Sequence, residues 1–271
     1  MSLDIYQKLA QHLDDLPAGF PSTESGVELR ILRRLFTPEE AEFALHLTLF
    51  PEEAEVISSR AEIAPEEAAQ RLDKMAKKGL IYSIERDGKL PKYMANQYIV
   101  GIWEFNVNNL DLDFIRDMEE YLPTLLHEAW KVPQLRTIPV GRSLTPQHEV
   151  LPYEQAEELV RAQNRFVVAP CICRREQSMV EKGCDRPEET CLVFGTAADY
   201  YLRNGLGRLI DLEETLEILD LAEKAGFVLQ PSNAKKAVNI CLCCGCCCLV
   251  LKNIKRHPKP ASMVSSPFVA T

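Results

Sequence analysis

Long apolar runs and a signal peptide are both missing from this sequence of 271 residues. No apolar run approaches the ~18 residues that a membrane-spanning helix needs. The N-terminal segment mixes acidic and apolar side chains without a basic start, an apolar stretch or a small-residue cleavage site. We therefore expect a cytoplasmic protein that does not insert into membranes.

Positive charge and catalytic motifs are also scarce. The formal net charge of -9 gives no overall attraction to nucleic acid or to an anionic membrane. The segment "NGLGRL", residues 204–209, lacks the third glycine of a dinucleotide-binding loop, and the five histidines show no metal-ligand spacing. Because no nucleophile or carboxylate constellation stands out, an electron carrier is favoured over a catalyst, although an enzyme with a cluster-bound substrate stays open.

Cysteine is absent before residue 171 and abundant after it. The ten are Cys171, Cys173, Cys184, Cys191, Cys241, Cys243, Cys244, Cys246, Cys247 and Cys248. Adjacent Cα atoms lie ~3.8 Å apart, whereas a relaxed disulfide needs ~4.4 to 6.8 Å, so neighbouring cysteines of the run 241–248 cannot pair without strain. In a reducing cytosol such cysteines indicate metal or redox chemistry.

The spacing of the second group favours an iron–sulfur site. Cys241, Cys244 and Cys247 reproduce the opening C-x2-C-x2-C of the bacterial ferredoxin pattern. Leu251 stands at the position of the usual fourth cysteine, so the missing ligand would come from Cys248 or from the first group. Cys243 and Cys246 form a competing C-x2-C pair in the same run, so the sequence does not decide which cysteines of the run are ligands.

The first group, Cys171 to Cys191, supplies four thiols, enough for one [4Fe-4S] cluster or one tetrahedral zinc ion. Gly183 and Pro187 would let its loop turn tightly. Arg174 and Arg175 would either offset cluster charge or be solvated surface residues. Zinc is the main alternative metal, although the cysteines form no clean pair of zinc knuckles, and a store of Cu(I) or zinc is a further one.

The first 108 residues predict helices followed by a hairpin. Thr37 to Glu40 is a capping box that starts a helix through His46. Further helices are predicted near 52–60 and from Pro65 to Lys78, where Gly79 ends the helix, and strands at 80–84 and 93–100. Helix, turn, helix, hairpin is the order of a winged-helix module.

The candidate recognition helix carries four basic residues, Arg71, Lys74, Lys77 and Lys78. Residues 1–108 nevertheless contain 18 acidic and 12 basic residues, a net charge of -6, and phosphate contact requires local positive charge. We therefore favour protein docking over DNA binding for this module.

Beyond it, a helix is predicted over 109–130, with Pro123 kinking or ending it. Residues 153–163 and 196–204 also predict helices, Asp211 with Glu214 predicts the start of another, and 165–169 and 227–229 predict strands. The expected fold is α+β and mainly helical. A winged-helix-like domain, 1–130, is joined by a proline-containing linker, 131–150, to a cysteine-rich α/β metal-cluster domain, 151–271.

The motifs "CICRREQ", "PEETCLVFG", "AEKAGFVLQPSN", "NICLCCGCCCLVL" and "SSPFVA" together resemble the ferredoxin-like 4Fe-4S iron–sulfur proteins of anaerobic bacteria and archaea. The resemblance covers roughly residues 150–270; the winged-helix-like half is less distinctive. It implies cluster binding by the first cysteine group and part of the second, in an electron-transfer context. The ferredoxin domain that commonly follows in that family is not in this chain, which is either a truncated form or one that works without it.

The expected function is electron transfer in anaerobic metabolism through one or two [4Fe-4S] clusters, with a redox partner protein. The alternatives are a metal- or redox-sensing winged-helix transcriptional regulator and a structural zinc-binding protein. The predicted cluster ligands are Cys171, Cys173, Cys184, Cys191, Cys241, Cys244, Cys247 and Cys248, with Cys243 and Cys246 as further candidate metal ligands.

Overall fold

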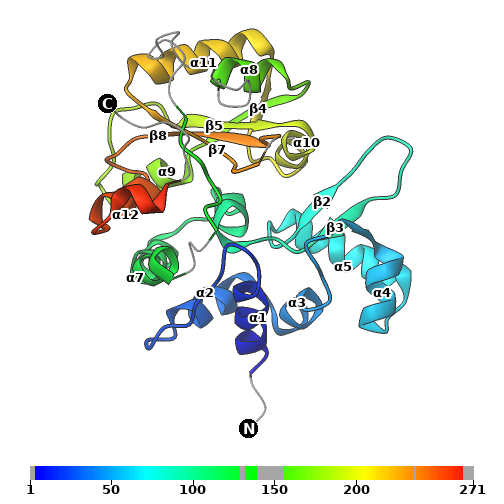
Figure 1. Cartoon of the computed structure of the whole chain (residues 1–271). Helices are drawn as coiled ribbons and strands as arrows, with labels where there is room; N and C mark the ends of the chain where they lie inside the picture. Colours follow the sequence, from blue (N-terminus) through cyan, green and yellow to red (C-terminus); the bar gives the residue numbers. More distant parts are fainter. Residues whose placement is uncertain (1–3, 129–131, 139–154, 235, 265–271) are drawn as a thin grey trace. The chain divides into compact units, whose positions relative to one another are not determined.

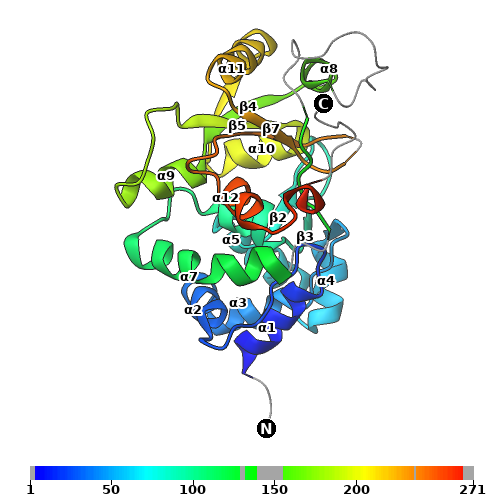
Figure 2. The same cartoon turned by 60° about the vertical axis from the view of Figure 1, so that its left-hand side comes forward.

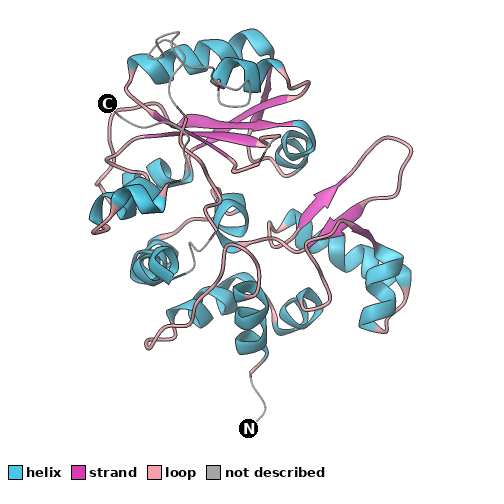
Figure 3. Ribbon diagram, viewed as in Figure 1, coloured by secondary structure: helices cyan, strands magenta, loops and turns pink. Residues whose placement is uncertain are grey.

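The computed structural model describes residues 4–128, 132–138, 155–234 and 236–264. The chain divides into two compact units, Met1–Val132 and Pro133–Thr271 (Figure 1). Helices and strands occur in both units, so the protein is α+β (Figure 3). No helix in the described ranges is long and apolar enough to cross a membrane.

The first unit contains helices and a small antiparallel sheet of three short strands. Its sheet has the order β1-β3-β2. The helices are α1 (Ile5–Asp14), α2 (Val27–Leu35), α3 (Pro38–Ala44), α4 (Ala54–Ala61), α5 (Pro65–Lys77), α6 (Trp103–Phe105) and α7 (Leu112–Glu128), with the turn η1 (Tyr98–Ile102); the strands are β1 (Glu52–Glu53), β2 (Tyr82–Ile84) and β3 (Lys92–Met94).

The predicted helix starts in this unit are confirmed. The Thr37 hydroxyl accepts a hydrogen bond from the Glu40 amide at 3.2 Å, and the Glu40 carboxylate accepts one from the Thr37 amide at 3.0 Å. With Pro38 at the first helical position, this capping box begins α3. Helix α5 begins at Pro65 and is followed by Gly79 at φ +75°, the left-handed conformation that ends many helices.

Two predictions in this unit are wrong. The strand predicted over 93–100 ends at Met94, and Tyr98 begins the irregular turn η1, in which residues 99–101 have non-helical backbone angles. Tyr98 lies in the aromatic core and not in the sheet, because its ring packs edge-to-face on Phe20 at a centroid distance of 4.9 Å. The second is wrong in part, because helix α7 does not end at Pro123 but continues through it. Pro123 lies on the exposed side of the helix, where water can satisfy the carbonyl that the proline leaves without a partner.

The second unit is built on a five-stranded sheet in the order β6-β4-β5-β8-β7, with every neighbouring pair antiparallel. Because no pair is parallel, this unit is α+β, and the predicted α/β class is wrong for it. The strands are β4 (Phe166–Pro170), β5 (Glu189–Phe194), β6 (Arg208–Ile210), β7 (Val228–Pro231) and β8 (Asn239–Cys243).

Helices cover both faces of this sheet. They are α8 (Ala156–Arg161), α9 (Ile172–Met179), α10 (Gly195–Arg203), α11 (Leu212–Lys224) and α12 (Leu249–Arg256), followed by the turn η4 (Pro260–Met263). Helices α8 and α11 lie on one side of the sheet, and α9 and α12 lie on the other (Figures 1 and 2).

Strand alternation separates apolar side chains from thiols. Leu192 on β5 and Ile240 and Leu242 on β8 belong to the core that also contains residues of α8 and α11. Because successive side chains point to opposite faces, Cys191, Cys241 and the other odd positions of these strands face away from that core. Cys191 lies directly opposite Cys241 in the register of β5 and β8.

The predicted elements of this unit are partly confirmed. Helices at 156–161 and 195–203 and strands at 166–170 and 228–231 match the expectation, and the Asp211 carboxylate caps α11 by accepting from the Glu214 amide at 2.9 Å. Strands β5, β6 and β8 and helices α9 and α12 were not predicted. Of the linker predicted over 131–150, residues 131 and 139–150 lie outside the described residues, whereas Leu135 and Ile138 form bridges to Ser232 and Leu229 within the second unit.

Candidate metal centre

Four thiols of the second unit converge on one point. The Sγ atoms of Cys184, Cys244, Cys246 and Cys247 all lie within 4.8 Å of one another. The Sγ–Sγ distance is 3.6 Å for Cys184 and Cys247, 4.0 Å for Cys184 and Cys244, and 4.0 Å for Cys246 and Cys247. We call these residues the four-thiol group.

The group is assembled from one loop and one turn. Cys184 lies in the loop between α9 and β5, where Gly183 approaches α9 so closely that a Cβ atom would lie 2.6 Å from the Ser178 Oγ atom. The other three cysteines follow β8 directly. Their turn is closed by the Cys248 amide, which donates to the Cys244 carbonyl at 3.1 Å before α12 begins.

Burial differs among the four thiols. Cys244 and Cys247 are 1% and 0% exposed, Cys184 is half-buried, and Cys246 is exposed. Burial alone would raise the pKa of Cys244, but hydrogen bonds from Cys246 and the Cys247 amide and the charge of Arg174 outweigh burial and lower the pKa to about 6. Burial and the contact with Cys184 raise the pKa of Cys247. Burial and hydrogen bonding therefore shift the pKa values of these two neighbouring thiols in opposite directions.

A buried arginine lies beside the group. Arg174 is 3% exposed, and its guanidinium stacks on the Phe227 ring at 4.4 Å from the centroid. It donates to the Leu242 carbonyl at 2.8 Å and to the Thr190 hydroxyl. Burial alone would lower its pKa, but the charges of Cys171 and Cys244 outweigh burial and raise it. Arg174 is thus a fixed positive charge beside the thiols.

Two further arginines lie nearer the surface. The Nη1 atom of Arg186, which is exposed, lies 3.6 Å from the Cys246 Sγ atom. Arg175 instead forms an ion pair with Glu188 at 2.7 Å. The sequence offered Arg174 and Arg175 either as charge-compensating residues or as solvated surface residues; in the structure Arg174 is buried beside the thiols, whereas Arg175 is half-buried and paired with an acidic residue.

The other six cysteines lie together elsewhere in the unit. The Cys173 thiol is in hydrogen-bonding contact with Cys171 and Cys248, and that of Cys243 with Cys241 and Cys248. Cys241 also contacts Cys191. All ten cysteines are free of disulfides. We call Cys171, Cys173, Cys191, Cys241, Cys243 and Cys248 the six-thiol group.

The structure therefore divides the cysteines differently from their order in the sequence. The predicted triplet is split, because β8 extends to Cys243 and holds Cys241 in the sheet while Cys244 and Cys247 follow in the turn. The first sequence group is also split, with Cys184 in the four-thiol group. Cys246 was not among the predicted cluster ligands; the sequence indicated it as a candidate metal ligand and, with Cys243, as a competing C-x2-C pair.

The chain was compared with protein-family models, curated proteins and solved structures. None of the three comparisons gave a match. The chemistry of the site therefore rests on the residues themselves.

The four-thiol group has the composition of a soft-metal site. Four cysteine sulfurs can hold one tetrahedral ion or the corners of an iron–sulfur cluster. Thiolate ligands select zinc, Cu(I) or iron–sulfur clusters over hard cations such as Mg²⁺ or Ca²⁺. The group can thus bind a metal, and the buried charge of Arg174 would offset part of the negative charge of the thiolates.

Proposed function

We propose that the second unit binds an iron–sulfur cluster through the four-thiol group and transfers electrons with it. The observation that carries this proposal is the convergence of Cys184 with three cysteines from a turn more than fifty residues later in the chain. Four thiolates match the ligand count of a [4Fe-4S] cluster. The resemblance of residues 150–270 to ferredoxin-like 4Fe-4S proteins supports the same choice of metal.

Two features of the surroundings fit electron transfer. Cys246 is exposed, so one corner of the site reaches the surface, where a partner protein can approach. Charge and hydrogen bonding near the sulfurs set the reduction potential of such clusters. Arg174, buried against Phe227, and Arg186, beside Cys246, would raise it by stabilising the more negative reduced state.

Structural zinc is the second candidate, and the sulfur spacing favours it. A Zn–S distance of about 2.3 Å gives a tetrahedron with edges of about 3.8 Å, close to the Sγ separations of 3.6 and 4.0 Å in the structure. A four-iron cluster would require the sulfurs to move apart, including those of the buried Cys244 and Cys247. Zinc would make the site a structural clamp without redox chemistry.

Metal analysis of anaerobically purified protein separates the two candidates. We expect acid-labile sulfide, about four iron atoms per cluster, broad absorption near ~400 nm and a paramagnetic signal on reduction. Cys184→Ser should remove the cluster held by the four-thiol group. Asp185→Ser, an exposed neighbour in the same loop, is the matched control and should keep it. Stoichiometric zinc without sulfide would overturn the iron–sulfur proposal.

The first unit fits a protein-docking role better than DNA binding. Its helix–helix–hairpin order supports a winged-helix-like module, but three of the four basic residues in and directly after α5 have acidic or aromatic partners. Arg71 is paired with Glu67 and its guanidinium lies 5.6 Å from the Phe43 ring centroid, Lys77 is paired with Asp73, and Lys78 with Glu40. These contacts reduce the positive charge that a phosphate backbone would need.

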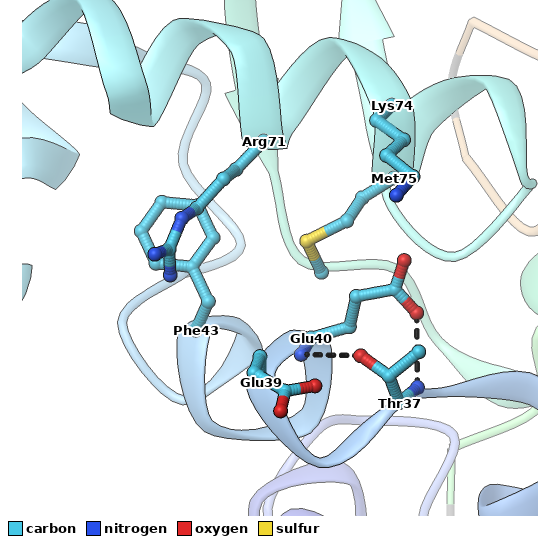
Figure 4. Close-up of a pocket in the computed structure, with 7 residues that line it drawn as sticks. All are labelled: Thr37, Glu39, Glu40, Phe43, Arg71, Lys74 and Met75. Atoms are coloured by element: carbon cyan, nitrogen blue, oxygen red, sulfur yellow. Dashed lines mark hydrogen bonds between the residues drawn. The ribbon is translucent and has the colours of Figure 1, made fainter.

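A shallow hollow between α3 and α5 shows the same charge balance. It has a volume of about 340 Å³ and is lined by Thr37, Glu39, Glu40, Phe43, Arg71, Lys74 and Met75 (Figure 4). Acidic and basic groups share its rim. The alternative, a redox-sensing transcriptional regulator, predicts DNA retardation that is lost when the cluster is removed and that falls steeply with salt; absence of retardation at low salt would exclude it.

A further inference from the structure

The six-thiol group has a geometry of its own, independent of the four-thiol group. Its members form a continuous series of thiol contacts in the order Cys171, Cys173, Cys248, Cys243, Cys241 and Cys191. Cys243 and Cys248 are buried, and the other four are half-buried. Six thiols in such a series exceed the four ligands that one tetrahedral ion uses.

Four elements of the second unit bring these thiols together. Antiparallel pairing sets Cys191 on β5 opposite Cys241 on β8, and strand alternation sets Cys243 on the same face as Cys241. Helices α9 and α12 lie on that side of the sheet (Figure 2). Cys171 and Cys248 occupy the N-cap positions of α9 and α12, so both helices begin at the thiols. The group is therefore a product of the fold of one unit.

Side-chain amides are directed at the sulfurs of this group. The Gln230 Nε2 atom donates to the Cys248 Sγ atom at 3.8 Å, and the Asn239 Nδ2 atom donates to the Cys241 Sγ atom at 3.5 Å. Gln230 is 2% exposed and Asn239 is 9% exposed. A buried amide donor requires an acceptor, and a metal-bound thiolate is a stronger acceptor than a neutral thiol. Such N–H···S contacts are typical of the outer shell of thiolate metal sites.

We propose that the six-thiol group binds a second, polynuclear iron–sulfur centre, separate from the metal of the four-thiol group. The existence of the second centre follows from the placement of its thiols and amides, whereas its iron–sulfur nature rests on the proposed function. Arg174 lies beside both groups, because its guanidinium is in hydrogen-bonding contact with Cys244 of one and donates to the Leu242 carbonyl, between Cys241 and Cys243 of the other. A single buried guanidinium thus compensates charge for both centres.

The proposal is tested on the full chain, purified anaerobically and reconstituted with iron and sulfide. Cys173→Ala/Cys243→Ala disables only the six-thiol group, and Cys184→Ala/Cys247→Ala disables only the four-thiol group. We expect each double variant to keep about half of the wild-type metal, with two different paramagnetic signals that add up to the wild-type spectrum. Full metal content in C173A/C243A would overturn the second centre.

A milder variant covers the case in which a double variant does not fold. Gln230→Leu removes the N–H···S contact to Cys248 but keeps all ten thiols. We expect it to shift the reduction potential or spectrum of the signal that C184A/C247A retains and to leave the other signal unchanged; two unshifted signals would contradict the proposal. If the wild type and all variants contain zinc without sulfide, the proposed function fails. Halving of the zinc content in each double variant would still show two centres.

Discussion

The two units of this protein are stabilised by different means. The first has no cysteine, and its apolar interior includes an aromatic cluster in which Phe20, Tyr98 and Tyr121 pack edge-to-face at centroid distances of 4.9 to 6.2 Å. The second has an apolar core on one face of its sheet and ten thiols, six of them gathered on the other face and at two helix starts. Apolar packing is complete without a ligand, whereas clustered thiolates repel one another until a cation compensates them. We therefore expect metal to affect the second unit and not the first.

Removal of the metal should have the largest effect. Structural zinc contributes about 10 to 16 kcal/mol in zinc-finger peptides; because the second unit also has an apolar core, we expect a smaller loss there, of several kcal/mol. After anaerobic chelation, hydrogen exchange should accelerate over residues 171–191 and 239–248. Helices α1 to α7 are the internal control. Equal acceleration of hydrogen exchange in both units would show that the two units do not differ in their dependence on metal.

Loss of a buried arginine should cost more than loss of an exposed one. Arg174→Gln leaves the Leu242 carbonyl and the neighbouring thiolates without their buried cation, and we expect a loss of about 3 kcal/mol in the second unit. Arg30→Gln in the first unit is the matched control. Arg30 is 44% exposed and pairs with Asp117 at 3.0 Å and Glu120 at 2.7 Å, so its loss should cost about 1 kcal/mol or less.

Denaturant-dependent hydrogen exchange, read separately for each unit, measures both arginine variants. Arg174→Lys adds a further check, because it keeps the charge but not the planar fork of donors. We expect Arg174→Lys to recover part of the loss. Equal losses for Arg174→Gln and Arg30→Gln would mean that the thiols gain nothing from the buried charge.

Two glycines offer a matched comparison of helix ends. In each unit a Schellman motif closes a helix: Leu80 donates to Met75 after α5, and Phe227 donates to Ala222 after α11. Each motif contains one glycine, Gly79 in the first unit with φ of +75° and Gly226 in the second with φ of +64°. A Cβ atom at Gly79 would lie 2.8 Å from the Phe105 Cβ atom, whereas one at Gly226 would meet nothing within 4 Å.

Gly226→Ala should therefore cost only the left-handed backbone strain, about 1 kcal/mol. Gly79→Ala should cost about 2 to 3 kcal/mol because a buried aromatic residue must also shift. Thermal unfolding monitored by hydrogen exchange in each unit gives both values. A larger loss for Gly226→Ala would indicate that the second unit is the more tightly packed at its helix ends.

The sequence predicted most of the first unit but little of the cysteine geometry, for a physical reason. Capping boxes and terminal glycines are local signals, so Thr37 to Glu40 and Gly79 locate helix ends without knowledge of the rest of the chain. The pairing of Cys191 with Cys241 joins residues fifty positions apart, and no local signal specifies it. A spacing rule grouped Cys241 with Cys244, but strand β8 ends between them and sends them to different groups.

The smallest expected effect is a pH dependence of the first unit that arises from His12. Burial lowers the pKa of His12, although a hydrogen bond to the backbone of Leu47 and the charge of Asp15 act in the opposite direction. The His12 Nε2 atom is buried and has no hydrogen-bond partner among the described residues. Protonation would add a buried N–H group without an acceptor, so the fold favours the neutral imidazole.

Because the folded-state pKa lies below the unfolded value of about 6.5, the unfolded state binds more protons as pH falls through that value. The first unit should hold its full stability above about pH 6.5 and lose part of it at lower pH. His12→Gln should flatten this dependence. Trp103 fluorescence in a Trp130→Phe background reports the denaturant midpoint. An equal pH dependence of the denaturant midpoint in wild type and His12→Gln would show that His12 titrates alike in the folded and unfolded states. The stability of the second unit should depend on pH in the same way in both proteins.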